Sequence, residues 1–212
     1  MRKFLKTSMI LMSLTLLGAC SSETVGLEPT LVEVETMAIM GNFPHYNSIE
    51  HLASTATEVV RVEFLDERVE AINIWLPPEN KLEETGESVD EAYHVYTVYR
   101  VRVLEVFQGN VNVGDILEVK QLGGQLDDLI VMNYDIIPFE SGDDLILFLQ
   151  SFASDDMPAS LLNAEQSAYR FTQSNENARN RNINDTLQSL NTQNDLTLTL
   201  NDLAVITENN SN

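Results

Sequence analysis

Apolar and polar residues alternate with a period of two through the centre of the chain. Between Glu58 and Phe64, apolar residues at every second position are separated by charged ones, which is typical of a β-strand with one buried face. The alternation resumes over residues 72–76 and stops at Pro77-Pro78, because proline cannot donate a hydrogen bond to a strand ladder. The pattern predicts a mainly-β fold.

A second alternating segment, Tyr93–Phe107, is rich in β-branched and aromatic residues, as strands are. Its apolar side chains occupy odd positions as far as Val103 and even positions from Leu104 onward. A change of phase inside one strand is what a β-bulge produces. Bulged, coiled strands turn the corners of small barrels, so we expect a barrel-like domain.

Shorter strands are expected between glycine- and proline-containing turns, over residues 116–122, 130–137, 145–149 and 168–172. The run Leu145–Leu149 is apolar without interruption, which predicts a strand buried on both faces. Asn47–Ala53 predicts a short helix with Asn47 or Ser48 as its N-cap. Residues 31–40 fit either a first strand or a turn.

The N-terminus has the features of an export signal. A basic start, Met1–Lys6, is followed by a short apolar stretch and by Leu17-Gly18-Ala19-Cys20, the order found in secretory signals. This tetrapeptide resembles the lipobox of bacterial lipoproteins, which are cut before the cysteine and carry diacylglycerol and acyl chains such as palmitate. We expect cleavage between Ala19 and Cys20 and a lipid on Cys20. The alternative is an ordinary secretory signal that happens to end near a cysteine.

Four segments follow from these patterns: a lipoprotein signal peptide over residues 1–19, lipidated Cys20 with a tether over 20–46, a β-barrel-like domain over 47–172, and a polar tail over 173–212. Within the tail, apolar residues return after Leu196, and Asn201 is a candidate cap for a short helix over 201–207. The rest of the tail is rich in Asn, Gln, Ser and Thr, which favours a mobile segment.

The domain resembles that of a group of uncharacterised bacterial surface lipoproteins, whose fold is similar to the netrin-module or metalloproteinase-inhibitor barrel, an OB-like fold. The resemblance rests on residues 58–62, 96–98, 103–109, 114–115, 123–124 and 142–149. It implies a small OB-like barrel with short helices, and it implies a fold more than a function, since such barrels host many activities. Inhibitors of that fold chelate a protease zinc through a free N-terminal cysteine, which a lipidated Cys20 could not provide.

Cysteine content and charge exclude several function classes. Cys20 is the single cysteine, so a lipid on it leaves the mature domain without a disulfide, a thiolate metal site or a cysteine nucleophile. The full chain has a net charge of −21, and loss of residues 1–19 leaves nine basic residues against 33 acidic ones, a net charge of −24. Such a surface repels nucleic acid and anionic lipid headgroups, so acyl chains alone would hold the protein on a membrane.

The pattern contains no catalytic motif. The histidines, His45, His51 and His94, lack metal-ligand spacing. The acidic pairs Asp127-Asp128 and Asp143-Asp144 lie in turns, where turn chemistry is the usual role of aspartate and a calcium site is the alternative. Nucleophile elbows and phosphate or dinucleotide loops are missing. We expect no metal, no cofactor and no enzymatic activity.

The acidic segment Glu79–Glu91 joins two predicted strands at one end of the barrel. Its acids would repel one another at helical spacing, which predicts a loop. Loops on rigid scaffolds often carry function, so the sharper hypothesis is an interaction loop that meets a cationic partner, either a basic protein surface or a divalent ion. The alternative is solvated charge. The acids concerned are Glu83, Glu84, Glu87, Asp90 and Glu91.

Together the sequence predicts an exported, extracytoplasmic protein of the cell envelope, held on a membrane by its lipid. The expected role is a non-enzymatic binding or interaction module, whose partner is an envelope protein or a cationic species. The alternatives are an extracellular hydrolase that uses acidic residues, recognisable by two carboxylates converging in a pocket, and a calcium-binding surface protein.

Overall fold

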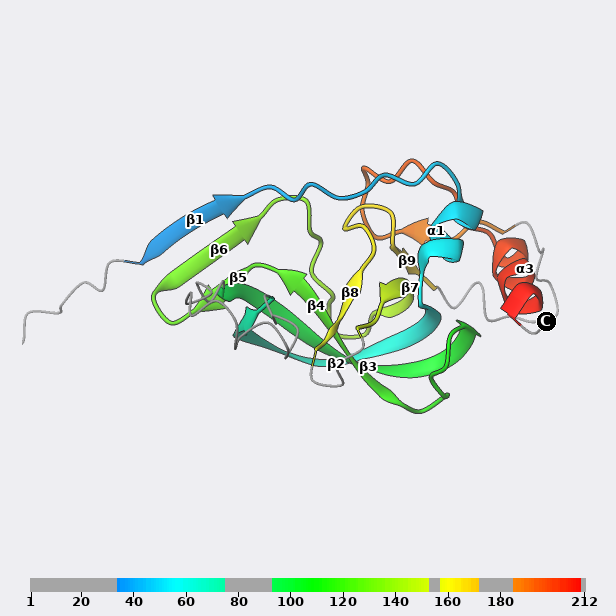
Figure 1. The fold of residues 1–212 in the computed structure, drawn as a ribbon, viewed down its shortest axis with the longest axis horizontal. Coiled ribbons are helices and arrows are strands. Elements are labelled where there is room, and N and C mark those ends of the chain that lie inside the picture. Colours follow the sequence, from blue (N-terminus) through cyan, green and yellow to red (C-terminus); the bar gives the residue numbers. More distant parts are fainter. Residues whose placement is uncertain (1–33, 75–92, 153–156, 172–184, 211–212) are drawn as a thin grey trace, which may run out of the picture. The chain divides into compact units, whose positions relative to one another are not determined.

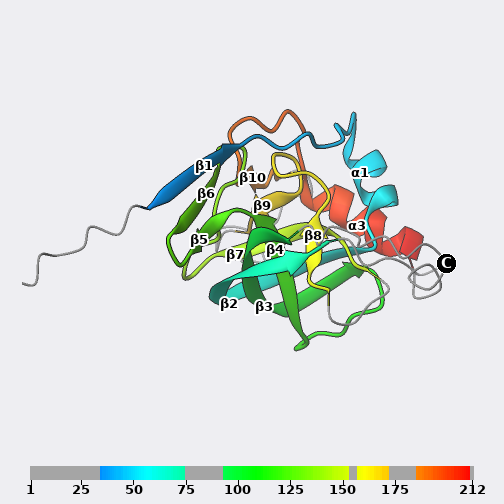
Figure 2. The same cartoon turned by 60° about the vertical axis from the view of Figure 1, so that its left-hand side comes forward.

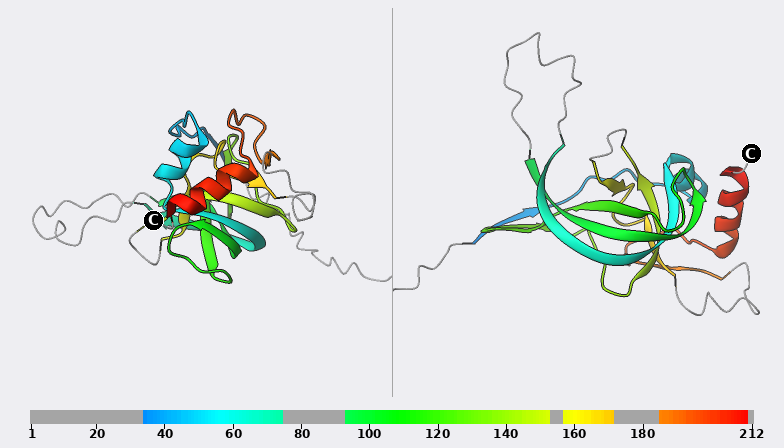
Figure 3. Two further views of the ribbon diagram at one scale, coloured as in Figure 1. Left: turned by 90° about the vertical axis from the view of Figure 1, so that its right-hand side faces the viewer. Right: turned by 90° about the horizontal axis from the view of Figure 1, so that it is seen from below.

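Two long antiparallel strands, β2 (Glu58–Asn73) and β3 (Tyr93–Gln108), form the centre of the fold (Figure 1). The structure is a computed structural model, which describes residues 34–74, 93–152, 157–171 and 185–210. Opposite Arg61 and Val62 the ladder passes from Glu105 to Val103, so Leu104 is an extra residue on β3. This bulge lies where the alternation changes phase, which confirms the sequence prediction. Figure 3 shows both strands strongly curved.

The strands close into a barrel. The main sheet has the order β10-β9-β7-β2-β3-β4-β8. It includes β4 (Ile116–Leu122), β7 (Asp144–Gln150), β8 (Ala159–Leu161), β9 (Ala168–Arg170) and β10 (Gln188–Ser189). The short β8 is parallel to β4 on one side and antiparallel to β7 on the other. It therefore closes β7, β2, β3, β4 and β8 into a five-stranded barrel, the architecture expected of an OB-like domain.

A smaller sheet extends beyond the barrel, with the order β1-β6-β5 (Figure 2). It consists of β1 (Glu35–Ile39), β5 (Gly124–Leu126) and β6 (Leu129–Asn133). β5 and β6 form a hairpin, and β1 pairs with β6 in parallel. Residues 31–40 thus contain a strand, which places part of the predicted tether in the folded unit. The predicted strand over 130–137 ends earlier, at Asn133.

Strand β7 lies between two apolar clusters and contributes side chains to both. Leu145, Leu147 and Leu149 face one apolar cluster with residues of β2, β3 and β4. Ile146 and Phe148 point the other way, into a second cluster. All five side chains are at most 1% exposed, which confirms the prediction of a strand buried on both faces.

The second cluster is covered by two helices, α1 (Ile49–Thr55) and α3 (Leu200–Asn210), which lie close together in Figure 3. α1 begins as predicted, with the Ser48 hydroxyl accepting a hydrogen bond from the His51 backbone N–H. Its C-terminal end is tied to β3, because Gln108 Nε2 donates to the backbone oxygens of Ala53 and Ala56.

The α3 helix differs from its prediction. It begins one residue before Asn201 and continues past residue 207. The prediction of Asn201 as its cap is wrong, since Thr199 and Asp202 cap each other: the Asp202 carboxylate accepts from the Thr199 backbone N–H, and the Thr199 hydroxyl accepts from the Asp202 backbone N–H. This reciprocal arrangement is a capping box.

The folded unit is also larger than the 47–172 range expected from the sequence. The described residues from Val34 to Asn210 all belong to one compact unit. Leu187, Leu198 and Leu203 are buried in the cluster beneath the helices, and β10 adds to the main sheet. Residues 185–210 therefore belong to the fold, whereas the sequence predicted a polar tail in which a short helix alone docks. The observed fold is mainly β, with short helices, as predicted.

Candidate functional site

The most polar part of the barrel interior lies at the end of β4. Leu117, Val119 and Gln121 share one side of this strand, because side chains alternate, and the first two are apolar while Gln121 is a carboxamide that is only 5% exposed. The next residues, Gly123 and Gly124, have φ values of 122° and 134°, which L side chains rarely adopt. A Cβ on Gly123 would lie 2.9 Å from the Val131 carbonyl oxygen. The glycine pair thus brings the β5–β6 hairpin against the barrel.

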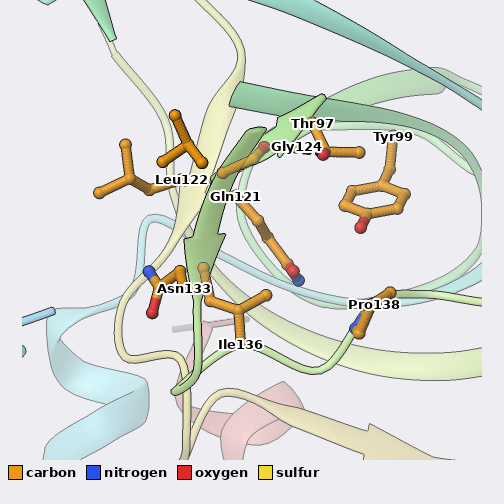
Figure 4. A pocket seen from close by; sticks show the side chains of 10 residues that line it. Thr97, Tyr99, Gln121, Leu122, Gly124, Asn133, Ile136 and Pro138 are labelled. Atoms are coloured by element: carbon orange, nitrogen blue, oxygen red, sulfur yellow. Dashed lines mark hydrogen bonds between the residues drawn. The ribbon is translucent and has the colours of Figure 1, made fainter. Parts of the chain in front are cut away.

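A cavity of about 180 Å³ lies between β3, the end of β4, the hairpin and residues 136–138 (Figure 4). We call it the Gln121 cavity. In Figure 4 the carboxamide of Gln121 points into the space between Tyr99, Ile136 and Pro138. Leu122, Val131, Ile136 and Pro138 supply apolar wall. Pro138 is exposed and Ile136 is half-buried, so this side of the cavity lies at the surface.

Two polar atoms of the lining are buried and unpartnered: Gln121 Oε1 and Asn133 Nδ2 form no hydrogen bond with any residue that the structure describes. The side-chain oxygen of Asn133 is occupied, since Oδ1 accepts from the Asp135 backbone N–H at 3.1 Å. Thr97 is occupied as well, donating to the Gly123 carbonyl oxygen at 2.8 Å. A buried polar atom without a partner costs about 1–3 kcal/mol, so the cavity retains an acceptor and a donor at the expense of stability.

The described lining is electrically neutral. Burial raises the pKa of Tyr99 to about 12, the negative charge of Glu67 adds to this shift, and the Phe139 backbone opposes it. Tyr99 is therefore an uncharged phenol near neutral pH. The other lining residues are apolar or carry an amide or a hydroxyl group. The Gln121 cavity is therefore suited to a neutral ligand.

A second cavity, of about 160 Å³, adjoins the first and shares Gln121, Leu122 and Ile136 with it, and Lys120, Tyr96 and Ser160 also contribute to its wall. Lys120 is 6% exposed, and its Nζ donates to the Pro158 carbonyl oxygen at 2.6 Å. The same nitrogen lies 4.1 Å from the centre of the Phe152 ring. Burial lowers the pKa of Lys120 to about 8.

Lys120 differs from the arginines in having no carboxylate partner among the described residues. The five arginines in the described ranges each form an ion pair with a carboxylate. Within the same ranges, no carboxylate lies within ion-pair distance of Lys120. Its Nζ lies instead near aromatic faces and a backbone carbonyl, and the lowered pKa shows that these contacts offset only part of the cost of burying the charge.

Neither of these two cavities is lined by an aspartate or a glutamate. The acidic pair after Gly142 is used in the fold: Asp144 binds Arg61 through both carboxylate oxygens, and Asp143 pairs with Arg170. The other predicted pair, Asp127-Asp128, connects β5 to β6, and Asp127 has a φ of 51°. Both pairs therefore lie in or beside turns, and Asp143-Asp144 also forms ion pairs.

The histidines lie apart in the fold. His45 Nε2 is 3.3 Å from an Asp195 carboxylate oxygen, His51 packs edge-on against the Tyr46 ring, and His94 pairs with Ile72 in the β2–β3 ladder. Among the described residues, no three His, Cys, Asp or Glu side chains gather as metal ligands would.

Several predicted site residues lie outside the described ranges: Ala19 and Cys20, and the proposed interaction loop of Glu83, Glu84, Glu87, Asp90 and Glu91. Sequence reasoning did not single out Gln121, Asn133 or Lys120. One signal was available for Gln121, because a polar residue occupied the apolar phase of a predicted strand immediately before two glycines. Asn133 and Lys120 gave no comparable signal.

No protein-family model, no curated protein and no solved structure matches this chain. In the described ranges, neither helix has the length and apolar character needed to cross a bilayer.

Proposed function

We propose that this protein is a bacterial lipoprotein of the cell envelope, anchored through Cys20 after removal of residues 1–19, whose mature domain is a non-enzymatic binding module. The anchor rests on Leu17-Gly18-Ala19-Cys20 behind a basic and an apolar segment. The binding role rests mainly on the Gln121 cavity, where buried polar atoms have no partner in the described part of the protein. Buried polar groups in folded proteins normally have hydrogen-bond partners, so buried groups that lack a partner within the protein favour a ligand that supplies one.

The hydrolase alternative is less well supported by the geometry. A general acid and base must both reach the reacting bond, and neither the Gln121 cavity nor the Lys120 cavity carries a carboxylate. A calcium-binding role would require several oxygen ligands at one point; no such cluster is found among the described residues, and the carboxylates of Asp143 and Asp144 already bind a turn N–H and arginines.

The anchor is tested by replacing Cys20 with alanine and following the full chain by membrane fractionation and mass spectrometry. The natural chain should be recovered with the membrane, beginning at a lipid-modified Cys20. The Cys20→Ala variant should not be cleaved before residue 20. It should be recovered in the soluble fraction, whereas the natural chain stays with the membrane. Membrane retention of Cys20→Ala at the natural level contradicts the anchor.

The binding role is tested by incubating the full chain with a solubilised envelope fraction and analysing the bound and unbound molecules over time. A binding module should retain a small molecule or a peptide that is recovered chemically unchanged. New products that accumulate with time and require the protein would instead support a hydrolase. An envelope fraction from which nothing is retained contradicts the binding role.

A further inference from the structure

We propose that the Gln121 cavity binds a neutral carboxamide, in which one amide group pairs edge to edge with the side-chain amide of Gln121. This inference rests on the proposed binding role and names the chemistry of its ligand. The ligand can be a free amide or the amide side chain of a peptide, and both sources present the same group to the cavity.

The hydrogen-bonding capacity of Gln121 points to this group. Its Oε1 is buried and has no partner among the described residues. A carboxamide offers two donors and an acceptor with two lone pairs. Two carboxamides can therefore form a pair of parallel N–H···O bonds, and this pairing is unchanged if the O and N of Gln121 are exchanged.

The size of the cavity sets a limit on the ligand. A cavity of roughly 150 Å³ can hold benzene, and the Gln121 cavity measures about 180 Å³. A short branched or aromatic amide therefore fits, with its hydrocarbon part against Val131, Ile136 and Pro138. Several ordered waters would also fit, and they are the competing occupant.

Charge favours the amide over the corresponding acid. The chain has a net charge of −21, so a carboxylate is repelled from a distance. Within the cavity it would meet a neutral lining with no arginine or lysine, and burying an unpaired carboxylate is costly. A carboxylate would also present no donor to Gln121 Oε1.

The test compares three molecules of the same shape on the full chain: isobutyramide, isobutyrate and methyl isopropyl ketone. Binding is followed by the melting temperature and by the side-chain NH₂ resonances of Gln121, identified from their loss in Gln121→Met. Isobutyramide should shift these resonances and raise the melting temperature. The ketone lacks donors and the acid is charged, so each should bind at least about tenfold more weakly. N-acetylglutamine methylamide, compared with its glutamate counterpart, tests the peptide source.

Variants separate the site from the fold. Gln121→Met removes a buried unpartnered group, so it should raise the melting temperature of the free protein and abolish its response to isobutyramide. Gln125→Met, on the exposed side of β5, is the matched control and should bind as the natural chain does.

Equal binding of the amide and the ketone overturns the proposal, as does the absence of any shift in the Gln121 resonances of the natural chain, which would leave water as the occupant. If the amides fail while the envelope fraction still yields an unchanged ligand, the carboxamide inference alone is wrong. If isobutyramide binds through Gln121 but the envelope fraction yields nothing, the cavity chemistry holds and the proposed cellular role does not.

Discussion

At the scale of single residues, the end of β4 holds two neighbouring polar side chains in opposite environments. Lys120 points away from the barrel interior and lies near two aromatic rings. Gln121 points into the barrel interior. Both are almost completely buried. Burial of polar groups is unfavourable unless they are paired, so both residues lower the stability of the free protein. Such positions are expected where a surface is kept for binding.

Replacing Lys120 with methionine should raise the free energy of unfolding at pH 7 and flatten its pH dependence. The pKa of Lys120 is about 8 in the folded protein and roughly 10.4 in an unfolded chain. Between these values the unfolded state binds more protons, so the stability of the natural chain should rise with pH. Denaturant unfolding between pH 7 and 10 measures this.

The control for that prediction is Lys120→Arg, which stays charged throughout the range and should be less stable without the rise. The range ends at pH 10, because burial raises the pKa of Tyr99 and Tyr169 to about 12. Above pH 10 those tyrosines keep protons that the unfolded chain loses, so stability falls. A natural chain whose stability is flat or falling from pH 8 to 10 contradicts the account of Lys120.

At the scale of elements, α3 shows how a segment with polar composition can complete a core. Leu203 and Ile206 face the cluster that α1, β2, β3, β7 and β9 form together, while Val205 faces solvent. Spacings of three and four residues place side chains on one helix face. Few apolar residues are therefore enough, provided that each lies on the buried face.

Replacing Leu203 with alanine should lower the free energy of unfolding by about 2–4 kcal/mol, since buried leucines cost that much to truncate. Val205→Ala is the matched control on the same helix, 41% exposed at Val205, and should change stability by less than about 0.5 kcal/mol. Urea unfolding of both variants measures the difference. Equal effects would show that α3 does not pack on the core.

At the scale of the whole molecule, acidic residues far outnumber basic ones. The chain contains 33 acidic and 12 basic residues. The five described arginines offset part of this excess through ion pairs, several of them on the exposed faces of β2, β3 and β4. Exposed pairs contribute little individually. The remaining charge repels itself and opposes the folded state.

The melting temperature should therefore rise when sodium chloride increases from about 10 to 150 mM, because the Debye length shrinks from roughly 30 to 8 Å. Differential scanning calorimetry at pH 7 measures this, and sodium fluoride serves as a check on specific chloride binding. A fall in melting temperature would show that the attractive ion pairs outweigh the net repulsion.

Periodicity in the sequence determined the features that depend on near neighbours. The alternation after Glu58, the phase change at Leu104 and the uninterrupted run Leu145–Leu149 each predicted a local structure, because side-chain direction along a strand is fixed by the backbone. The Ser48 cap was predictable as well, because a capping side chain bonds a backbone N–H only three residues further along the chain. The lipobox-like tetrapeptide ending at Cys20 is also a local signal, and the anchor that it implies stays a prediction.

Only the tertiary structure decided what depends on residues far apart in the chain. The barrel closes through the three-residue strand β8, which carries no pattern of its own. Residues 185–210 read as a tail because their composition is polar, and they fold because a few leucines meet a core formed elsewhere. Gln121 and Asn133 come together only when the β5–β6 hairpin packs on the barrel. Contacts between distant segments set these features, and no local periodicity encodes them.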